Sequence, residues 1–434
     1  LLCAVAKSNG QFDDIAANED IFQAKLMNFL TPTPASVNRR FKEKYAQSPK
    51  AATDYFFDLS KKNDYIKTRA IAKNEHFYSA SPYGELEITI NLSKPEKDPK
   101  QIAAEKNAVQ SSYPKCLLCI ENEGYTGRLN HPARTNHRIV QLDLAGETWG
   151  FQYSPYAYFN EHSIILAEKH SPMKISQVTF ARLLAIVDSL PTYFAGSNAD
   201  LPIVGGSILS HDHYQAGHHD FPMAKAELKR QFVIPTFPNV VAGIVNWPMS
   251  VIRLTADNSQ DLVAASTFIL EKWQQYTDES VEIVARTAYG TQHHTITPIA
   301  RRRGDDFEID LVLRDNNTSE QHPDGIFHPH SDVQHIKREN IGLIEVMGLA
   351  ILPGRLKTEL EVVKRYILGE ADTVADYHQP WAEELKQAYQ NEAIDDYMQA
   401  ALGQVFLTVL EHAGVFKDTT DGNAAFARFI AELK

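Results

Sequence analysis

Two histidines and a glutamine alternate in Ser-His-Asp-His-Tyr-Gln at residues 210–215. If this stretch is extended, His211, His213 and Gln215 project from one face, because side chains alternate along a strand. An uncharged imidazole is a competent nucleophile near neutral pH, and a neighbouring amide can donate to phosphoryl oxygens as negative charge develops on them. The spacing therefore favours chemistry at phosphorus. The alternative is a solvent-facing strand that happens to carry two histidines.

A second candidate group begins at the C-x-x-C pair Cys116 and Cys119. This spacing is common in protein zinc sites, which need two further ligands. We prefer His170 and His211, because a closed Cys₂His₂ site would fix the loop against the strand and orient His213 beside it. The alternatives are a redox dithiol or two reduced cysteines without a shared ligand.

A third, histidine-rich stretch at residues 322–335 competes for the role of nucleophile. It contains His328 and His330, but Asp332 rather than Gln stands two residues past His330. An anion at that position would repel a phosphate instead of stabilising it. We therefore expect this stretch to line the substrate site or to form a structural loop.

Further donors for a nucleotide, sugar or phosphate are clustered in three segments. The loop at 125–138 follows the C-x-x-C pair and is rich in Arg, Asn, His and Gly, but its glycines fit neither the P-loop nor the Rossmann pattern. Residues 301–303 are three arginines, and Lys94, Lys97 and Lys100 lie in a polar loop. These cations suit charge-assisted contacts with phosphate, although a solvated hairpin tip is the alternative for at least one arginine.

Composition limits the class of protein. The chain has 434 residues, 43% of them hydrophobic, and a formal net charge of -12. This predicts roughly two to three domains with a sizeable core, and argues against a disordered chain or a nucleic-acid binder. No run reaches the about 18 apolar residues of a membrane span, and three cysteines make a disulfide framework implausible, so we expect a soluble cytoplasmic protein. Because the first residue is Leu, we also expect an N-terminal piece to be missing.

Hydrophobic periodicity places these motifs on strands and loops. Residues 19–73 are charged and typical of helices, and a capped helix is predicted between Ser176 and Pro191. The strands predicted in the first block are 86–92, 139–142, 148–153, 163–167 and 205–210.

A second block repeats this alternation of strands and helices. It contains strands near 240–245 and 250–255, a helix through 262–276, and a hairpin whose arms are 294–300 and 307–313. The chain after residue 357 is again typical of helices. The two blocks predict an α+β protein with antiparallel sheet, and they suggest a duplicated unit.

Together these residues resemble the galactose-1-phosphate (hexose-1-phosphate) uridylyltransferases of the histidine-triad superfamily. The similarity is closest to the branch that carries Ser-His-Asp-His-Tyr-Gln where the better-known branch has His-Pro-His-Gly-Gln. The stretches that support it are 84–100, 116–138, 152–156, 160–162, 205–215 and 342–350. The resemblance implies two histidine-triad-like halves between helical ends. The predicted divisions are 1–83 (helical N-terminal part), 84–230 (catalytic half), 231–356 (second half) and 357–434 (helical C-terminal part).

The resemblance implies a ping-pong exchange of UMP between UDP-glucose and galactose-1-phosphate by a homodimer without an organic cofactor. His213 would hold UMP as a uridylyl-histidine, and Gln215 would steady the non-bridging oxygens. The residues that match the zinc ligands of the better-known branch are, in order, Cys116, Cys119, His170 and His211. We expect substrate contacts from Arg128, Asn130, Arg134, Asn160, Ser210, Arg301, His328 and His330.

Two features depart from the better-known branch. Asp212 and Tyr214 replace Pro and Gly inside the motif, and a second metal site has only Glu227 and residues 293–294 as loose candidates. One alternative function is a nucleotidyl phosphorylase or hydrolase of the same superfamily, which would share the nucleophile. Another is a non-catalytic, zinc-stabilised nucleotide- or sugar-binding protein, in which the glutamine of the motif would have no evident use.

Overall fold

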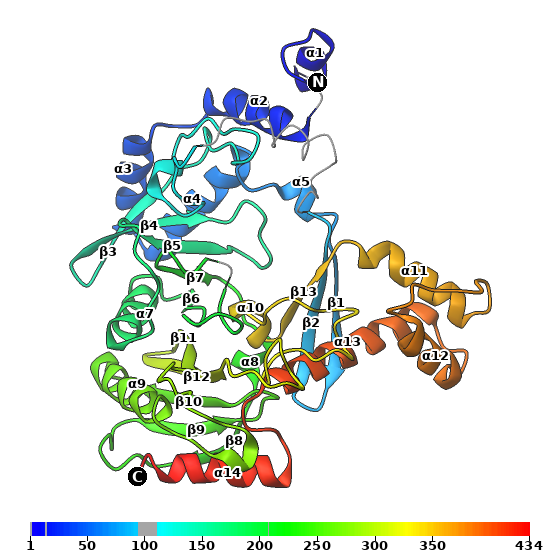
Figure 1. The fold of residues 1–434 in the computed structure, drawn as a ribbon. Coiled ribbons are helices and arrows are strands. Elements are labelled where there is room, and N and C mark those ends of the chain that lie inside the picture. Colours follow the sequence, from blue (N-terminus) through cyan, green and yellow to red (C-terminus); the bar gives the residue numbers. More distant parts are fainter. Residues whose placement is uncertain (1, 14, 94–110, 207) are drawn as a thin grey trace.

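A computed structural model describes residues 2–13, 15–93, 111–206 and 208–434. The lysine-rich loop predicted at 94–100 lies outside these ranges. The described chain forms a ten-stranded sheet and a separate three-stranded sheet, both flanked by helices (Figure 1). Every neighbouring pair in the large sheet is antiparallel, so the predicted α+β class is confirmed.

Helices precede the first strand, as the charged N-terminal sequence predicts. Two of them start at a proline, where the missing N–H costs no hydrogen bond, and the side chains of Thr33 and Ser48 cap them by accepting from backbone N–H groups. The helices are α1 (Leu2–Ser8), α2 (Ala16–Asn28), α3 (Pro34–Tyr45), α4 (Pro49–Lys62) and α5 (Thr68–Ile71).

The large sheet is built from two halves of the same topology. Each half is a three-stranded meander, a helix and two more strands, and its last strand inserts beside the third strand of the meander. The first half contains β3 (Val140–Leu144), β4 (Glu147–Tyr153), β5 (Ser163–Ala167), α7 (Gln177–Ser189), β6 (Phe194–Gly196) and β7 (His213–Gly217). The second contains β8 (Leu228–Phe232), β9 (Val241–Val245), β10 (Val251–Ala256), α9 (Ser259–Trp273), β11 (His294–Arg303) and β12 (Asp306–Asp315).

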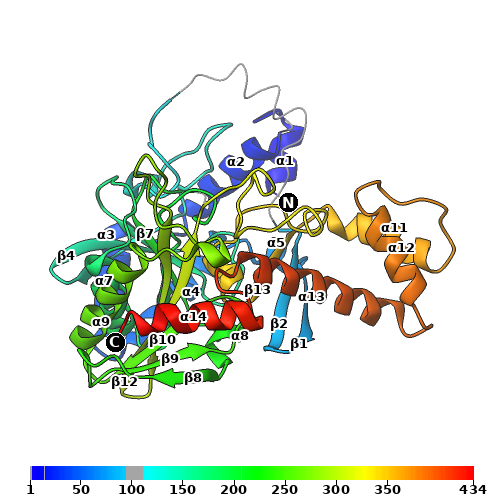
Figure 2. The same cartoon turned by 60° about the horizontal axis from the view of Figure 1, so that its bottom comes forward.

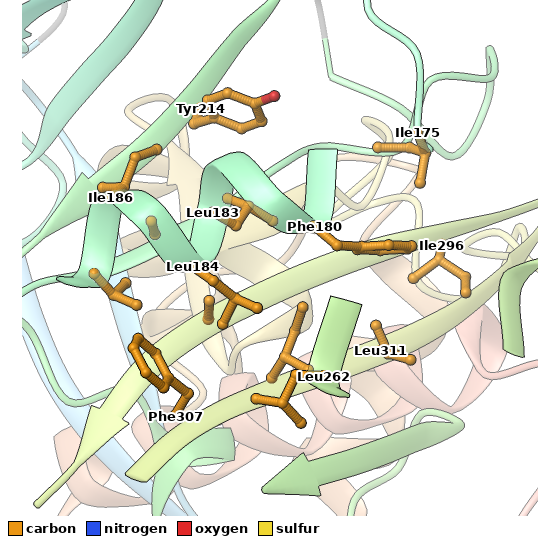
Figure 3. Packing of buried hydrophobic residues seen from close by; sticks show 14 of the residues in the cluster. Ile175, Phe180, Leu183, Leu184, Ile186, Tyr214, Leu262, Ile296, Phe307 and Leu311 are labelled. Carbon is orange, nitrogen blue, oxygen red and sulfur yellow. The ribbon is translucent and has the colours of Figure 1, made fainter. Parts of the chain in front are cut away.

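The halves join through pairing of β6 with β11, which gives the strand order β3-β4-β5-β7-β6-β11-β12-β10-β9-β8. From one edge the strands run β3-β4-β5-β7-β6, and from the other edge their equivalents run β8-β9-β10-β12-β11. The predicted duplication is therefore present in the topology. Leu183 and Leu184 of α7 lie between Tyr214 of β7 and Leu262 of α9 in one buried cluster (Figure 3). Burial of these side chains ties the strand that carries the histidine motif to the core of both halves.

The small sheet and the C-terminal helices lie beside the large sheet. The small sheet has the order β1-β2-β13, and β13 runs parallel to β2. Its strands are β1 (Glu75–Ser81), β2 (Gly84–Asn91) and β13 (Leu349–Pro353), and short helices α8 (Pro222–Lys225) and α10 (Leu343–Val346) lie nearby. The remaining helices are α11 (Leu356–Ile367), α12 (Gln379–Ala388), α13 (Ile394–Ala413) and α14 (Thr420–Ala431).

The C-terminal helices first extend away from the body of the molecule and then run back to it. Helices α11 and α12 project from the body, and α13 runs back along the small sheet (Figures 1 and 2). Helix α14 then packs on the second half, where Phe429 contacts the ring of Trp273 with centroids 5.3 Å apart. In the described ranges, no helix combines the length and the apolar character that a bilayer span requires.

One predicted strand is wrong. Residues 205–206 and 208–210 are irregular apart from a single bridge between Ala199 and Gly205, and the strand begins only at His213. The two glycines at 205 and 206 approach residues 198–201 so closely that a Cβ on Gly205 would lie 2.5 Å from the carbonyl oxygen of Leu201. This close packing, rather than sheet pairing, decides the path of the chain before the motif.

Candidate functional site

The motif histidine on β7 is held with one ring nitrogen free. His213 pairs with Leu166 of β5, and its Nδ1–H donates to the carbonyl oxygen of His211 at 2.8 Å. A carbonyl only accepts, so the proton is on Nδ1 and Nε2 keeps its lone pair. Among the described residues, none forms a hydrogen bond to Nε2. This is the arrangement that a nucleophilic imidazole needs.

Burial keeps the ring of His213 neutral. The side chain is 6% exposed, and loss of solvent is the main reason that its pKa falls to about 4. Tyr214, which points to the opposite face of β7, packs on Trp149 with ring centroids 5.2 Å apart. One face of the strand is thus anchored in the core while the other presents His213.

Gln215 lies on the same face as His213, about 6.6 Å further along β7. Its Oε1 accepts a hydrogen bond from Nε2 of His162 at 3.1 Å. Gln215 also lines a cavity of about 790 Å³. Its other walls come from within residues 337–345, from the ends of β2 and β13, and from Tyr158, Asn198, Gly205 and Gly206. This volume is within the range of about 300 to 1,000 Å³ that small-molecule sites occupy.

A buried cation faces the same cavity. Lys337 is 5% exposed, and its ammonium lies 3.1 Å from Glu345 and 3.5 Å from Glu339. Burial alone would lower the pKa of Lys337, but the two carboxylates outweigh it and raise the pKa. The charged side chain suits an anionic ligand. Sequence reasoning missed Lys337, because nothing local in residues 337–345 indicates that they meet β7.

The four predicted metal ligands are brought together. The ligand atoms of Cys116, Cys119, His170 and His211 all lie within 4.8 Å of one another. Four of the separations are 3.5 Å between the sulfurs, 3.2 and 3.8 Å from the sulfurs to Nδ1 of His211, and 3.3 Å from Cys119 to Nδ1 of His170. Tetrahedral zinc with two sulfur and two nitrogen ligands has edges of about 3.4 to 3.8 Å. The four separations lie inside this range or within about 0.2 Å of it, so the residues fit such an ion.

The thiol chemistry also suits a cation. Burial raises the pKa of Cys116, but hydrogen bonds from His211, the Leu118 backbone and Cys119 lower it overall. Burial, together with the neighbouring Cys116, raises the pKa of Cys119 to about 11. The Cys116 thiol therefore ionises readily, whereas the Cys119 thiol stays protonated beside the negative charge of Cys116. A divalent cation would remove that repulsion and hold both as thiolates.

His211 connects the Cys₂His₂ cluster to His213. Its Nε2–H donates to the carbonyl oxygen of Ala167 at 2.8 Å, which turns Nδ1 toward the cysteines. Its own carbonyl accepts from His213. Ala167 is the last residue of β5, the neighbour of β7. A metal held here would fix the loop at 116–119 against this strand end and, through His211, the ring of His213.

The predicted substrate residues of the loop at 125–138 are engaged within the protein. Arg128 donates to Asn130 at 2.7 Å and to the carbonyl oxygen of Tyr113 at 2.8 Å. Arg134 is buried and donates to the hydroxyl of Tyr65 at 2.6 Å. None of these three predicted residues lines the 790 Å³ cavity.

Three of the other predicted contacts are also away from the cavity walls. Asn160 and Ser210 are exposed, and Asn160 donates to the carbonyl oxygen of His218. Arg301 is buried in ion pairs with Glu308 at 2.6 Å and Asp310 at 2.8 Å. The structure thus gives the Arg301 guanidinium protein carboxylates as partners.

The competing histidine stretch lies behind the cavity wall. Nε2 of His328 is 3.3 Å from Oδ1 of Asn340, and Asn340 lines the cavity. His330 is stacked between His322 and His412, at centroid distances of 3.9 and 4.2 Å. His328 therefore supports a lining residue, whereas His330 belongs to a histidine stack.

The loose candidates for a second metal site do not form one. His294 is buried against Trp273, its Nδ1–H donates to the Trp273 carbonyl oxygen at 2.8 Å, and its Nε2 lies 3.0 Å from the Asp315 carboxylate. His293 contacts Asn316. In the part of the chain that the structure describes, the only group of three or more potential ligands at one point is the Cys₂His₂ cluster, which does not include Glu227.

Comparison with known proteins points to one family. Residues 4–172 match "Galactose-1-phosphate uridyl transferase, N-terminal domain", and residues 186–383 match the corresponding C-terminal domain. Proteins named galactose-1-phosphate uridylyltransferase are similar to almost the whole chain. That of Enterococcus faecalis is 58% identical over 99% of this chain and 86% of its own length. Those of Streptococcus pneumoniae and Lacticaseibacillus casei are 60% and 59% identical, over 97% and 100% of this chain and 86% and 89% of their own lengths.

Solved structures are more distant. Yeast Ap4A phosphorylase Apa2 has 14% sequence identity and a TM-score of 0.37, over 75% of this chain and 90% of that protein. Its complex with Ap4A gives a TM-score of 0.38 at 12% identity. The family assignment therefore depends on the sequence matches.

Proposed function

The chain belongs to the galactose-1-phosphate uridylyltransferase family, and we propose that Nε2 of His213 carries the transferred uridylyl group in a ping-pong reaction. The enzyme is a UDP-glucose:hexose-1-phosphate uridylyltransferase, which exchanges UMP between UDP-glucose and galactose-1-phosphate. The observation that carries the proposal is the locked Nδ1–H of His213, which leaves Nε2 as the nucleophile beside a cavity-lining glutamine.

In the first step, the lone pair of Nε2 forms a bond to the α-phosphorus of UDP-glucose. The bond from that phosphorus to the bridging oxygen breaks, and glucose-1-phosphate leaves with the electron pair. Negative charge grows on the non-bridging oxygens of the transferred group, where the amide N–H groups of Gln215 would donate. Lys337 would bind the phosphate of the leaving sugar in the same cavity.

In the second step, a phosphate oxygen of galactose-1-phosphate attacks the same phosphorus. The P–N bond breaks, the electron pair returns to Nε2, and UDP-galactose is released. No proton has to move onto Nε2 in either direction, because Nδ1–H stays with the His211 carbonyl throughout. The positive charge of the uridylyl-imidazolium would be partly offset by that carbonyl dipole.

We also propose zinc in the Cys₂His₂ cluster and a homodimer as the working form. The metal would be held by Cys116, Cys119, His170 and His211, and its chemistry would be structural, since four protein ligands complete a tetrahedral site. What supports this is the fit of the separations and the aligned His211, whose carbonyl positions the nucleophile.

Isotope exchange tests the ping-pong step. The enzyme is incubated with UDP-glucose and radiolabelled glucose-1-phosphate, with galactose-1-phosphate left out. A uridylyl-enzyme predicts that label enters UDP-glucose, because the first step is reversible on its own. An enzyme that forms UDP-galactose but shows no such partial exchange would require direct transfer between the two substrates and would overturn the covalent mechanism.

A further inference from the structure

A tight turn at residues 157–162 presses against the catalytic strand. Glu161 has a left-handed backbone, with φ of 55°, and Gly217 of β7 faces the turn. A Cβ on Gly217 would lie 2.7 Å from the ring of Phe159 and 2.9 Å from the carbonyl oxygen of Glu161. The glycine thus permits the close approach that brings the next residue, His162, to Gln215.

The ring of His162 is fixed in place and in tautomer. It is 4% exposed and lies between aromatic neighbours, with centroids 4.3 Å from Phe159 and 5.5 Å from Tyr158. The backbone N–H of Tyr158 points at Nδ1 at 3.5 Å. Because that N–H can only donate, Nδ1 accepts, and the ring proton is on Nε2. Burial lowers the pKa of His162 to about 4, so the ring is neutral near pH 7.

This tautomer decides which end of the Gln215 amide faces the cavity. Nε2–H of His162 donates at 3.1 Å, so the glutamine atom that meets it must be the carbonyl oxygen. The amide nitrogen then points away from His162, with two N–H groups available to a ligand. In the flipped amide, the carbonyl oxygen would face the ligand and repel an anionic phosphoryl group.

We propose that His162 is a positioning residue for uridylyl transfer, which holds the Gln215 amide with its N–H groups toward the reacting phosphoryl oxygens. The inference rests on the proposed function and extends it to the segment Asn160-Glu161-His162, which the resemblance includes but gives no catalytic part. In this chain of hydrogen bonds each group donates to the next: the Tyr158 N–H to His162, and His162 to Gln215. The Gln215 amide would then donate to the substrate.

A double-mutant cycle tests this proposal. His162→Phe keeps a flat ring between the aromatic neighbours but removes the donor, and His162→Gln restores an N–H of similar reach. We expect His162→Phe to lower kcat by about tenfold to a hundredfold, because a misdirected amide donor is lost from the transition state. KM for UDP-glucose should change by less than about twofold, and His162→Gln should recover most of the rate.

The decisive comparison is made in a Gln215→Ala background. If His162 acts through the glutamine, His162→Phe should cost nothing further there. His76→Phe, an exposed histidine on β1, is the matched control and should keep the wild-type rate. If the His162→Phe protein does not fold, His162→Met, which also lacks a donor, replaces it.

Three results would overturn the inference: a wild-type kcat in the donor-free variant, the same loss with and without Gln215, or no recovery in His162→Gln. Isotope exchange by the wild-type enzyme distinguishes a failure of this inference from a failure of the proposed function. If the wild type itself shows no partial exchange, the covalent mechanism is wrong. If the wild type exchanges label and the cycle shows no coupling, only the role of His162 is wrong.

Discussion

The strands β7 and β12 occupy equivalent positions in the two halves of the large sheet but carry different chemistry. On β7, Gln215 lines a cavity, and His213, on the same face of the strand, is fixed by the hydrogen bond from its Nδ1–H to the His211 carbonyl oxygen. On β12, Asp310 is fully buried and bonds to Arg253 of β10 at 2.7 Å and to Arg301 of β11 at 2.8 Å. The same topology therefore supports a reactive face in one half and an ion-paired face in the other.

The comparison shows that topology places a strand, whereas the partners of its side chains decide its function. Among the described residues, none bonds to Nε2 of His213, the proposed nucleophile, while the guanidinium groups of the second half are matched by carboxylates. The polypeptide just after the second half still serves the site, because residues 337–345 line the cavity that Gln215 faces. Mutations on the histidine-bearing strand of the first half should accordingly reduce activity, and mutations on the ion-paired face of the second half should reduce stability.

Loss of the His213 imidazole in the first half should reduce activity more than any other change. His213→Ala should lower the exchange rate by at least about 10⁴-fold, because the nucleophile is lost and the remaining binding groups supply only residual catalysis. Thermal unfolding should stay close to that of the wild type, since the ring makes one backbone hydrogen bond. Steady-state exchange assays and a melting curve check both statements. Appreciable exchange by the folded variant would assign the nucleophile elsewhere.

Loss of a cluster cysteine should affect both activity and stability. Cys116→Ser removes a thiolate ligand, so bound metal measured by elemental analysis should fall, with a lower melting temperature. The rate should drop by more than about tenfold, because His211 is no longer fixed beside His213. Cys3→Ser, on α1, is the control and should change neither quantity. Full metal content and an unchanged melting temperature in Cys116→Ser would contradict the cluster assignment.

In the second half, breaking the ion-paired face should cost stability instead. Asp310→Asn leaves Arg253 and Arg301 with an uncompensated charge, and the free energy of unfolding should fall by about 3 to 5 kcal/mol. The rate per folded molecule should remain close to that of the wild type. Urea denaturation and exchange assays on the same samples measure the two. The exposed Asp305→Asn, at the hairpin turn, should be neutral, and a loss of kcat in Asp310→Asn greater than the loss of folded protein would link this face to catalysis.

The folded protein should lose stability in acid. Burial lowers the pKa of His131 and of His162 to about 4, below the ordinary histidine value of 6.5. At pH values between about 4 and 6.5, the unfolded chain binds more protons than the folded chain does. The stability that depends on these histidines being neutral is therefore complete above pH 6.5 and is lost as the pH falls toward 4. Although burial raises it, the pKa of Asp310 is lowered overall by Arg301 and Arg253, so its ion pairs persist across this window.

Denaturation at pH 7 and pH 5 measures this dependence. We expect a lower free energy of unfolding at pH 5, with net proton uptake on unfolding. Equal stability at the two pH values would mean that these histidines are already protonated in the folded protein.

Among substitutions around the site, one in the loop behind the cavity should change the rate least. His328→Ala removes a contact to Asn340 and should lower the rate only modestly, with the uridylyl-enzyme still formed. Labelling with radioactive UDP-glucose checks this directly. Complete loss of labelling in a folded variant would transfer the nucleophile's role to residues 322–335.

Local sequence patterns predicted the elements that carry the site. The helix between Ser176 and Pro191 is α7, Gln177–Ser189, because a capping serine and a helix-breaking proline act on neighbouring residues. The Cys₂His₂ cluster followed from ligand types and from the family resemblance, and its four members do meet.

Long-range contacts could not be predicted in the same way. His162 and Lys337 reach the site only because the turn at 157–162 meets β7 and the loop at 337–345 closes the cavity. Arg301 is different, since the hairpin register places it directly opposite Glu308. Counting back from the turn at Gly304 would have indicated an ion pair rather than a substrate contact.

Mass spectrometry of the intact enzyme after incubation with UDP-glucose alone shows whether His213 holds the uridylyl group. We expect one added uridylyl group per chain, located on the peptide that contains His213 and removed by galactose-1-phosphate with formation of UDP-galactose. An enzyme that completes the exchange but carries no adduct, or carries it on another residue, would show that His213 does not hold the uridylyl group.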